Sequence, residues 1–228
     1  MARFAMVIDL HKCVGCAACD IACKIENNLD ADVHWSDHFT ETRGSFPNVR
    51  YQYVPTLCNH CEDAPCVKVC PTKAMFKNGD GIVLHNADTC IGCRSCQLAC
   101  PYNVIYFNEE QQHNMYRNDQ PLMPGLTASG KEIADKAKAP IPNYNPDREK
   151  TYQGIRQKGI VEKCTFCDHR VKEGKQPACV EACPPEARIF GDLDDRKSKV
   201  NQLLGKHTSR QLLKSKGTRP KVFYIRDF

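Results

Sequence analysis

Residues 13–23 have the sequence CVGCAACDIAC, in which four cysteines follow the spacing C-x2-C-x2-C-x3-C. The same spacing returns in residues 90–100, CIGCRSCQLAC. Two further runs complete the set, so the 16 cysteines of this 228-residue chain form four groups of four with none left over. The groups are Cys13, Cys16, Cys19, Cys23; Cys58, Cys61, Cys66, Cys70; Cys90, Cys93, Cys96, Cys100; and Cys164, Cys167, Cys179, Cys183.

The spacing C-x2-C-x2-C-x3-C is typical of bacterial ferredoxins, in which the fourth cysteine ligates the other cluster of a pair. Three thiolates on one tight loop reach three iron corners of one cubane, and the fourth points the other way. Gly15 and Gly92 lack a Cβ, which lets backbone N–H groups approach the inorganic sulfides. Pro71, Pro101 and Pro184 follow the last cysteine of a group and turn the chain away. These features predict four 4Fe–4S clusters.

The cysteine groups repeat in pairs. Residues 66–74 and 179–187 share the pattern Cys-Val-x-x-Cys-Pro-x-x-Ala, just as residues 13–23 and 90–100 share theirs. The resulting order a-b-a′-b′ indicates a duplicated unit. A unit of strand, cluster loop, short helix and return strand is ferredoxin-like, so we expect an α+β fold with two ferredoxin-like domains.

The distances between groups predict which of them share clusters. The gap from Cys70 to Cys90 is 19 residues and that from Cys100 to Cys164 is 63 residues. Pairing the second group with the third is therefore the local solution, and it leaves the first with the fourth. With the fourth ligand exchanged within each pair, the expected sites are Cys13, Cys16, Cys19 with Cys183; Cys164, Cys167, Cys179 with Cys23; Cys58, Cys61, Cys66 with Cys100; and Cys90, Cys93, Cys96 with Cys70.

Two other uses of cysteine fit this pattern less well. Structural zinc takes two C-x2-C pairs per site, and a triple C-x2-C-x2-C run does not suit it. Disulfide frameworks belong to small secreted chains, and three cysteines on one tight loop are poorly placed to find three partners. The sequence contains no Ser–His–Asp set, phosphate-binding loop or G-x-G-x-x-G motif. We therefore expect iron–sulfur chemistry and no substrate catalysis by this chain alone.

Charge and hydropathy exclude further classes. The chain has 32 basic and 27 acidic residues and no recognition motif for nucleic acid, so we expect no such partner. Its mean hydropathy is −0.53 and no apolar run approaches the roughly 18 residues of a spanning helix. The apolar residues 4–8 are too few for a secretory signal, so we expect no export signal on this chain. Basic residues in 196–199 and 214–216 suggest a solvated or partner-facing tail.

Between the cysteine groups, the sequence predicts short strands and two insertions. Residues 24–57 form the first insertion, in which we expect Trp35 to pack and find no support for a metal site at His34 and His38. Residues 109–160 form a polar second insertion with a short helix at 131–138. Strands are expected at 5–8, 81–84, 104–107, 188–190 and, as a strand or docking segment, 222–225. The expected division is one domain of 1–46 plus 160–193, a second of 47–108, a polar insertion at 109–159 and a C-terminal tail at 194–228.

Histidines and basic residues also lie beside the cysteines. His60 and His169 are expected to hydrogen-bond near the clusters, because sixteen thiolates already complete four cubanes. Lys12, Arg94 and Lys163 each adjoin a cysteine. A positive charge there favours the reduced cluster and raises its potential.

The four-group pattern resembles the electron-transfer subunit of molybdopterin oxidoreductases. That family includes the iron–sulfur subunits of dimethyl sulfoxide, polysulfide, thiosulfate, tetrathionate and respiratory arsenate reductases, and the resemblance covers residues 5–107 and 160–193. Within it, the chain is most similar to the small subunits of respiratory arsenate reductases. The segments that carry this similarity are 8–16, 55–61, 162–170 and 222–226.

The resemblance implies how such a chain works. Two ferredoxin-like domains related by a pseudo-two-fold would carry four 4Fe–4S clusters in line, with the cluster of Cys13, Cys16, Cys19 and Cys183 nearest a large molybdopterin (bis-MGD) catalytic subunit. Cys96 implies a full cubane where some relatives have Trp and a three-iron cluster. Electrons would come from a quinol-oxidising membrane subunit or a cytochrome. The expected location is the periplasmic side of the cytoplasmic membrane, reached with a catalytic subunit that bears a twin-arginine leader.

Overall fold

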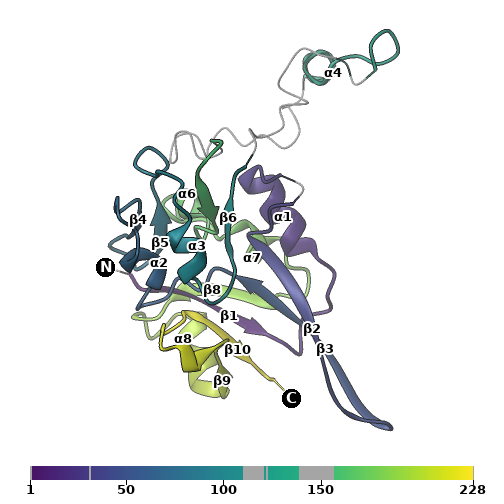
Figure 1. The fold of residues 1–228 in the computed structure, drawn as a ribbon. Coiled ribbons are helices and arrows are strands. Elements are labelled where there is room, and N and C mark those ends of the chain that lie inside the picture. Colours follow the sequence, from purple (N-terminus) through teal and green to yellow (C-terminus); the bar gives the residue numbers. More distant parts are fainter. Residues whose placement is uncertain (1, 31, 110–120, 122, 139–156, 228) are drawn as a thin grey trace.

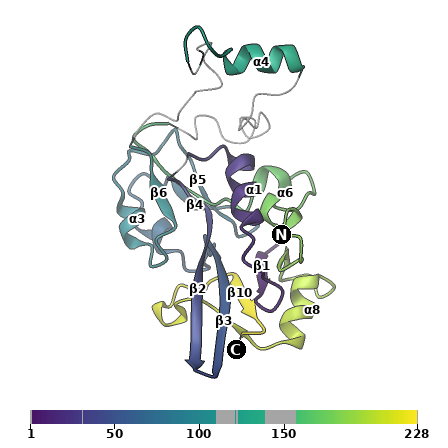
Figure 2. The same ribbon diagram turned by 90° about the vertical axis from the view of Figure 1, so that its right-hand side faces the viewer.

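The computed structural model describes residues 2–30, 32–109, 121, 123–138 and 157–227. It has the expected α+β character, with short helices and small sheets (Figures 1 and 2). The largest sheet has the order β8-β1-β10-β9. Strand β1 pairs antiparallel with β8 and parallel with β10, so the two ends of the chain lie side by side. These strands are β8 (Arg188–Asp192), β1 (Phe4–Asp9), β10 (Val222–Ile225) and β9 (Ser209–Arg210).

Strand β1 is buried on both faces. Met6 and Ile8 face the core that contains cysteines of all four groups. Ala5 and Val7 face a second, smaller core closed by α8 (Lys199–Lys206). Continuous burial explains why residues 5–8 are apolar without alternation. The strands predicted at 5–8, 188–190 and 222–225 are confirmed, and the segment after residue 194 is folded, with α8, β9, η1 (Lys214–Lys216) and β10.

A long hairpin fills most of the first insertion. It consists of β2 (Ser36–Ser45) and β3 (Asn48–Leu57), paired antiparallel along their whole length. The hairpin extends away from the rest of the molecule in both views (Figures 1 and 2). Its base is buried at Val54 and Leu57, whereas Phe46 at the tip is 92% exposed. Trp35, just before β2, is buried in the core, so the expectation that it packs is confirmed.

Two short hairpins complete the sheets. Strand β4 (Met75–Lys77) pairs with β5 (Val83–His85), and β6 (Ile105–Phe107) pairs with β7 (Val161–Lys163). The strands predicted at 81–84 and 104–107 are confirmed with shifted boundaries. Helix α4 (Gly130–Ala137) confirms the helix predicted at 131–138, and its N-cap Ser129 accepts from Glu132 N at 3.1 Å. Most of the second insertion lies outside the described residues.

The remaining helices each carry cysteines or lie beside them. Helix α1 packs against α7, and α2 packs against α3. The first cysteine group therefore faces the fourth, and the second faces the third. In the described part of the chain, no helix combines the length and apolar character needed to cross a membrane. These helices are α1 (Ala18–Asn27), α2 (Pro65–Lys68), α3 (Ser95–Ala99), α6 (Asp168–Val171) and α7 (Ala178–Glu181).

Candidate metal centres

The first and third cysteine loops have the same backbone conformation. Gly15 and Gly92 have φ of +67° and +68°, and the N-cap residues Ala17 and Arg94 have φ of 57° and 60°. A Cβ on Gly92 would lie 2.0 Å from the carbonyl oxygen of Gly159. Both the positive φ and this close approach require glycine. The repeat seen in the sequence is therefore also a repeat of loop geometry.

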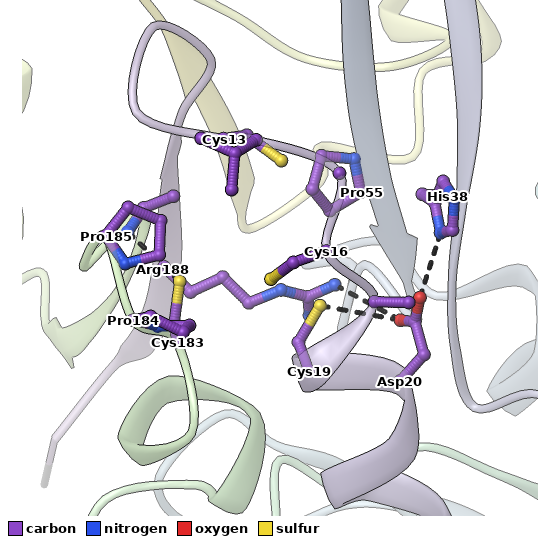
Figure 3. Close-up of a pocket in the computed structure, with 14 residues that line it drawn as sticks. Cys13, Cys16, Cys19, Asp20, His38, Pro55, Cys183, Pro184, Pro185 and Arg188 are labelled. Atoms are coloured by element: carbon purple, nitrogen blue, oxygen red, sulfur yellow. Dashed lines mark hydrogen bonds and ion pairs between the residues drawn. The ribbon is translucent and has the colours of Figure 1, made fainter.

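The structure brings three cysteines of the first group to one of the fourth. Cys13, Cys16, Cys19 and Cys183 line a cavity of about 390 Å³ between α1 and the start of β8 (Figure 3). Arg188 and Asp20 also line this cavity. Cys16 is exposed, so this set lies at the molecular surface.

A second set lies deeper. Cys23, Cys164, Cys167 and Cys179 are all buried. Burial raises the pKa of Cys23 well above its usual value, and the neighbouring charges of the other three thiols raise it further. The Asn27 side-chain amide lies 3.4 Å from Cys23 Sγ and 3.9 Å from Cys167 Sγ. An amide donor between two thiol sulfurs is suited to stabilising their thiolate forms.

The third and fourth sets lie in the other half. Cys58, Cys61, Cys66 and Cys100 line a cavity of about 330 Å³. Burial raises the pKa of Cys66 to about 12, with a smaller contribution from Cys58. Burial also raises the pKa of Cys96 to about 11, with Cys90, Cys70 and Cys93 as charged neighbours. Cys93 is exposed, so the fourth set, like the first, reaches the surface.

Buried cations lie between these sets. Lys163 lines the third cavity, and its Nζ donates to the carbonyl oxygens of Val83 and Cys164. Arg188 lines the first cavity and is 2% exposed. Its Nε and Nη1 have no hydrogen-bond partner among the described residues. Sets of mostly buried thiols beside buried cations fit anionic iron–sulfur cubanes, because cluster binding removes the thiol protons and supplies the missing negative charge.

The histidines behave as the sequence predicts. His60 is fully buried, and its Nδ1 accepts from Val83 N at 3.1 Å. Burial holds the pKa of His60 well below its usual value, so the ring is neutral. His169 Nε2 lies 2.7 Å from Glu26 Oε1. Each therefore takes the hydrogen-bonding role expected of it.

Other neighbours of the cysteines were not foreseen. Asp20 accepts from Ser36 Oγ at 2.7 Å and pairs with His38 at 2.9 Å. Arg188 was expected within a strand, without a role at the cysteines. One signal could have revealed it: Arg188 follows Cys183 by five residues, where the other copy of the repeat has Met75 after Cys70.

Comparisons with known proteins agree with this geometry. One family model described as a 4Fe–4S dicluster domain matches residues 49–117 and 147–193, and another of the same description matches residues 12–74. The chain is 54% identical to the arsenate respiratory reductase iron–sulfur subunit of Shewanella sp. (strain ANA-3), over 99% of this chain and 97% of that protein. It is 39% identical to a putative dimethyl sulfoxide reductase iron–sulfur subunit of Halobacterium salinarum, over 99% of this chain and 79% of that protein.

A third relative is an iron–sulfur-type chain of the polysulfide reductase of Wolinella succinogenes, at 33% identity over 98% of this chain and 94% of that protein. The matches to these relatives extend over all four cysteine groups, and the two family models together cover them as well. The expected cofactor class is thereby confirmed. This protein belongs to the 4Fe–4S dicluster family of iron–sulfur subunits and carries 4Fe–4S clusters.

Proposed function

We propose that the chain is the electron-transfer subunit of a respiratory arsenate reductase, passing electrons through four 4Fe–4S clusters to a molybdopterin (bis-MGD) catalytic subunit. The observation that carries this proposal is the gathering of sixteen cysteines into four adjoining sets. The near-complete match to an arsenate respiratory reductase subunit, at 54% identity, favours this substrate.

We assign one cluster to each set. Cys13, Cys16, Cys19 and Cys183 hold cluster 1; Cys23, Cys164, Cys167 and Cys179 hold cluster 2; Cys58, Cys61, Cys66 and Cys100 hold cluster 3; and Cys70, Cys90, Cys93 and Cys96 hold cluster 4. Neighbouring thiols support this order: Cys179 raises the pKa of Cys19, although burial is the larger cause, and Cys58 does the same for Cys164. Packing of α2 on α3 brings clusters 3 and 4 together.

The same assignment supports a division into domains. Residues 1–46 plus 160–193 form the domain of clusters 1 and 2, residues 47–108 form that of clusters 3 and 4, and the two are related by a pseudo-two-fold. Residues 109–159 are a polar insertion, and residues 194–228 follow the first domain. Strand β10 supports the last point, because it lies in the sheet of β1.

The mechanism requires no bond-making by this chain. Each cubane, when bound, accepts and releases one electron. The residues of this chain hold the clusters close together, exclude water and set each potential by charge and hydrogen bonds. Cluster 1 reaches the surface at Cys16, beside exposed Val14 and Ile21, and cluster 4 reaches it at Cys93, beside exposed Ile91 and Leu98. We place the catalytic subunit at the first end and the electron donor, a quinol-oxidising membrane subunit or a cytochrome, at the second.

The complex is proposed to act on the periplasmic side of the cytoplasmic membrane, exported with the catalytic subunit. The same relay could serve a polysulfide, thiosulfate, tetrathionate or dimethyl sulfoxide reductase or an arsenite oxidase, and the 33% identity to a polysulfide reductase component keeps this open. A candidate of another class is a free-standing polyferredoxin. The exposed apolar residues at both ends favour fixed partners.

Deletion of the gene in the native host tests the substrate. We expect loss of growth with arsenate as the electron acceptor, with fermentative growth unchanged. The intact gene should restore growth, and the Cys16→Ser variant should not. Undiminished growth on arsenate, with loss of growth on polysulfide, would overturn the arsenate assignment and keep the electron-transfer role.

A further inference from the structure

Arg188 is the first residue of β8 and lies five residues after Cys183. Its side chain extends across the cavity of cluster 1 toward Cys19 and Asp20 (Figure 3). The residue is 2% exposed, so water does not screen its charge.

The same guanidinium acts on cluster 2. Burial raises the pKa of Cys179, and Arg188 opposes that shift more strongly than any other group. It opposes the corresponding rise at Cys19 of cluster 1. One buried cation therefore adjoins ligands of two clusters.

Protein groups leave this cation incompletely compensated. Its Nη2 donates to Ser36 Oγ at 2.8 Å, and its one ion pair with a described residue is a loose contact of 3.8 Å to Asp20 Oδ1. Asp20 also accepts from Ser36 and binds His38, so its charge is shared. A guanidinium with five donors is rarely buried without stronger partners. The anionic clusters on either side are the partners that it lacks.

The repeat shows that the loop itself does not require a charge here. Met75 occupies the equivalent position after Cys70 and is also the first residue of its strand, β4. It is as deeply buried as Arg188. The arginine therefore distinguishes the pair of clusters 1 and 2 from the pair of clusters 3 and 4.

We propose that Arg188 is a shared counter-ion of clusters 1 and 2 that raises the reduction potentials of both. The proposal rests on the cluster assignment given above. Reduction adds a negative charge to a cubane, and a buried cation beside it stabilises that charge. Electrons are thereby drawn toward the end of the relay where Cys16 is exposed. Arg188 is a positioning residue for charge and is not itself reduced or oxidised.

The test compares Arg188→Met, which installs the residue of the other repeat, with Arg188→Lys, which keeps the charge. The intact complex is titrated without oxygen, and each cluster is followed by electron paramagnetic resonance. At a fixed potential, we expect Arg188→Met to lower the reduced-to-oxidised ratio of two clusters at least tenfold, equivalent to about 59 mV for one electron. Arg188→Lys should shift them far less, and Met75→Leu should shift none.

Unchanged potentials in Arg188→Met would overturn the proposal, as would equal shifts in Arg188→Met and Arg188→Lys or a shift spread over all four clusters. If Arg188→Met fails to retain its iron, Arg188→Gln takes its place. Loss of iron from both neutral variants but not from Arg188→Lys would support a charge requirement, and loss from all three would overturn it. Four signals with normal potentials in a wild-type complex that does not reduce arsenate would refute the proposed substrate and leave this inference intact.

Discussion

Individual residues around the cysteines show how little freedom the loops have. Gly92 adopts φ +68°, and a Cβ there would collide with the carbonyl oxygen of Gly159. Gly174 adopts φ +75°, and no atom of the described residues lies within 4 Å of the position that its Cβ would take. The two glycines therefore share a backbone conformation and differ in available space. This difference separates the cost of a positive φ from the cost of a collision.

We predict that Gly92→Ala loses about a quarter of the iron, because a displaced loop cannot hold cluster 4. Gly174→Ala, the matched control, should keep all its iron and lose only about 1 kcal/mol of stability. Iron analysis and anaerobic thermal unfolding measure both effects. Equal iron content in the two variants would contradict the steric argument.

His85 should make the protein sensitive to acid. Burial lowers the pKa of His85 to about 4, with a smaller contribution from Lys163. The unfolded state takes up a proton near pH 6.5 and the folded state does not, so stability is lost as pH falls from about 6.5 toward 4. The expected loss is about 2 kcal/mol between pH 7 and pH 5.

His85→Leu should remove most of this pH dependence, and the same change at the half-buried His207 should not. Anaerobic denaturant unfolding at pH 7 and pH 5 measures the difference. The same acid-induced loss in His85→Leu as in the wild type would show that other groups cause it.

At this scale, sequence reasoning found the cysteines and glycines because their spacing is local. It missed the role of Arg188 and the contact of Asn27 with two thiols. Arg188 meets Cys19 across 169 positions of sequence, and Asn27 meets Cys167 across 140. Such contacts are set by the packing of α1 on α7, which no local pattern encodes.

Among the elements, β10 has the greatest structural consequence. It lies between β1 and β9, and Val222 and Ile225 are fully buried. Tyr224 Oη donates to the Pro55 carbonyl at 2.7 Å and ties this strand to hairpin β2–β3. The last strand therefore closes the core around the clusters.

We predict that Val222→Asp destabilises the protein by several kcal/mol, because it buries an unpaired carboxylate. Phe46→Asp at the hairpin tip makes the same chemical change at an exposed position and should stay within about 0.5 kcal/mol of the wild type. Thermal unfolding and cluster retention compare the two. Similar stability in both variants would show that β10 is not part of the core.

The elements differ in how far the sequence predicts them. Strands β1 and β10 were predictable because they are short apolar runs. Strands β2 and β3 were not, because the outer part of the hairpin is exposed and its sequence lacks apolar alternation. Pairing along ten positions stabilises it instead.

For the whole molecule, folding and cluster binding are expected to be one process. The main core contains cysteines of all four groups. Without clusters, it would keep cavities of about 390 and 330 Å³ and leave the charge of Arg188 without compensation. Removal of iron with a chelator under reducing conditions should therefore abolish cooperative thermal unfolding. A cooperative transition in iron-free protein would contradict this coupling.

The most direct test of the account is a count of metals in the intact complex. The tagged chain is purified from its native host without oxygen, and iron, acid-labile sulfide, zinc, molybdenum and tungsten are measured together. Four cubanes predict about sixteen irons and sixteen sulfides per chain, with molybdenum or tungsten in a stably associated large subunit. Iron without a large partner would favour a free polyferredoxin, and zinc in place of iron would contradict the electron-transfer role itself.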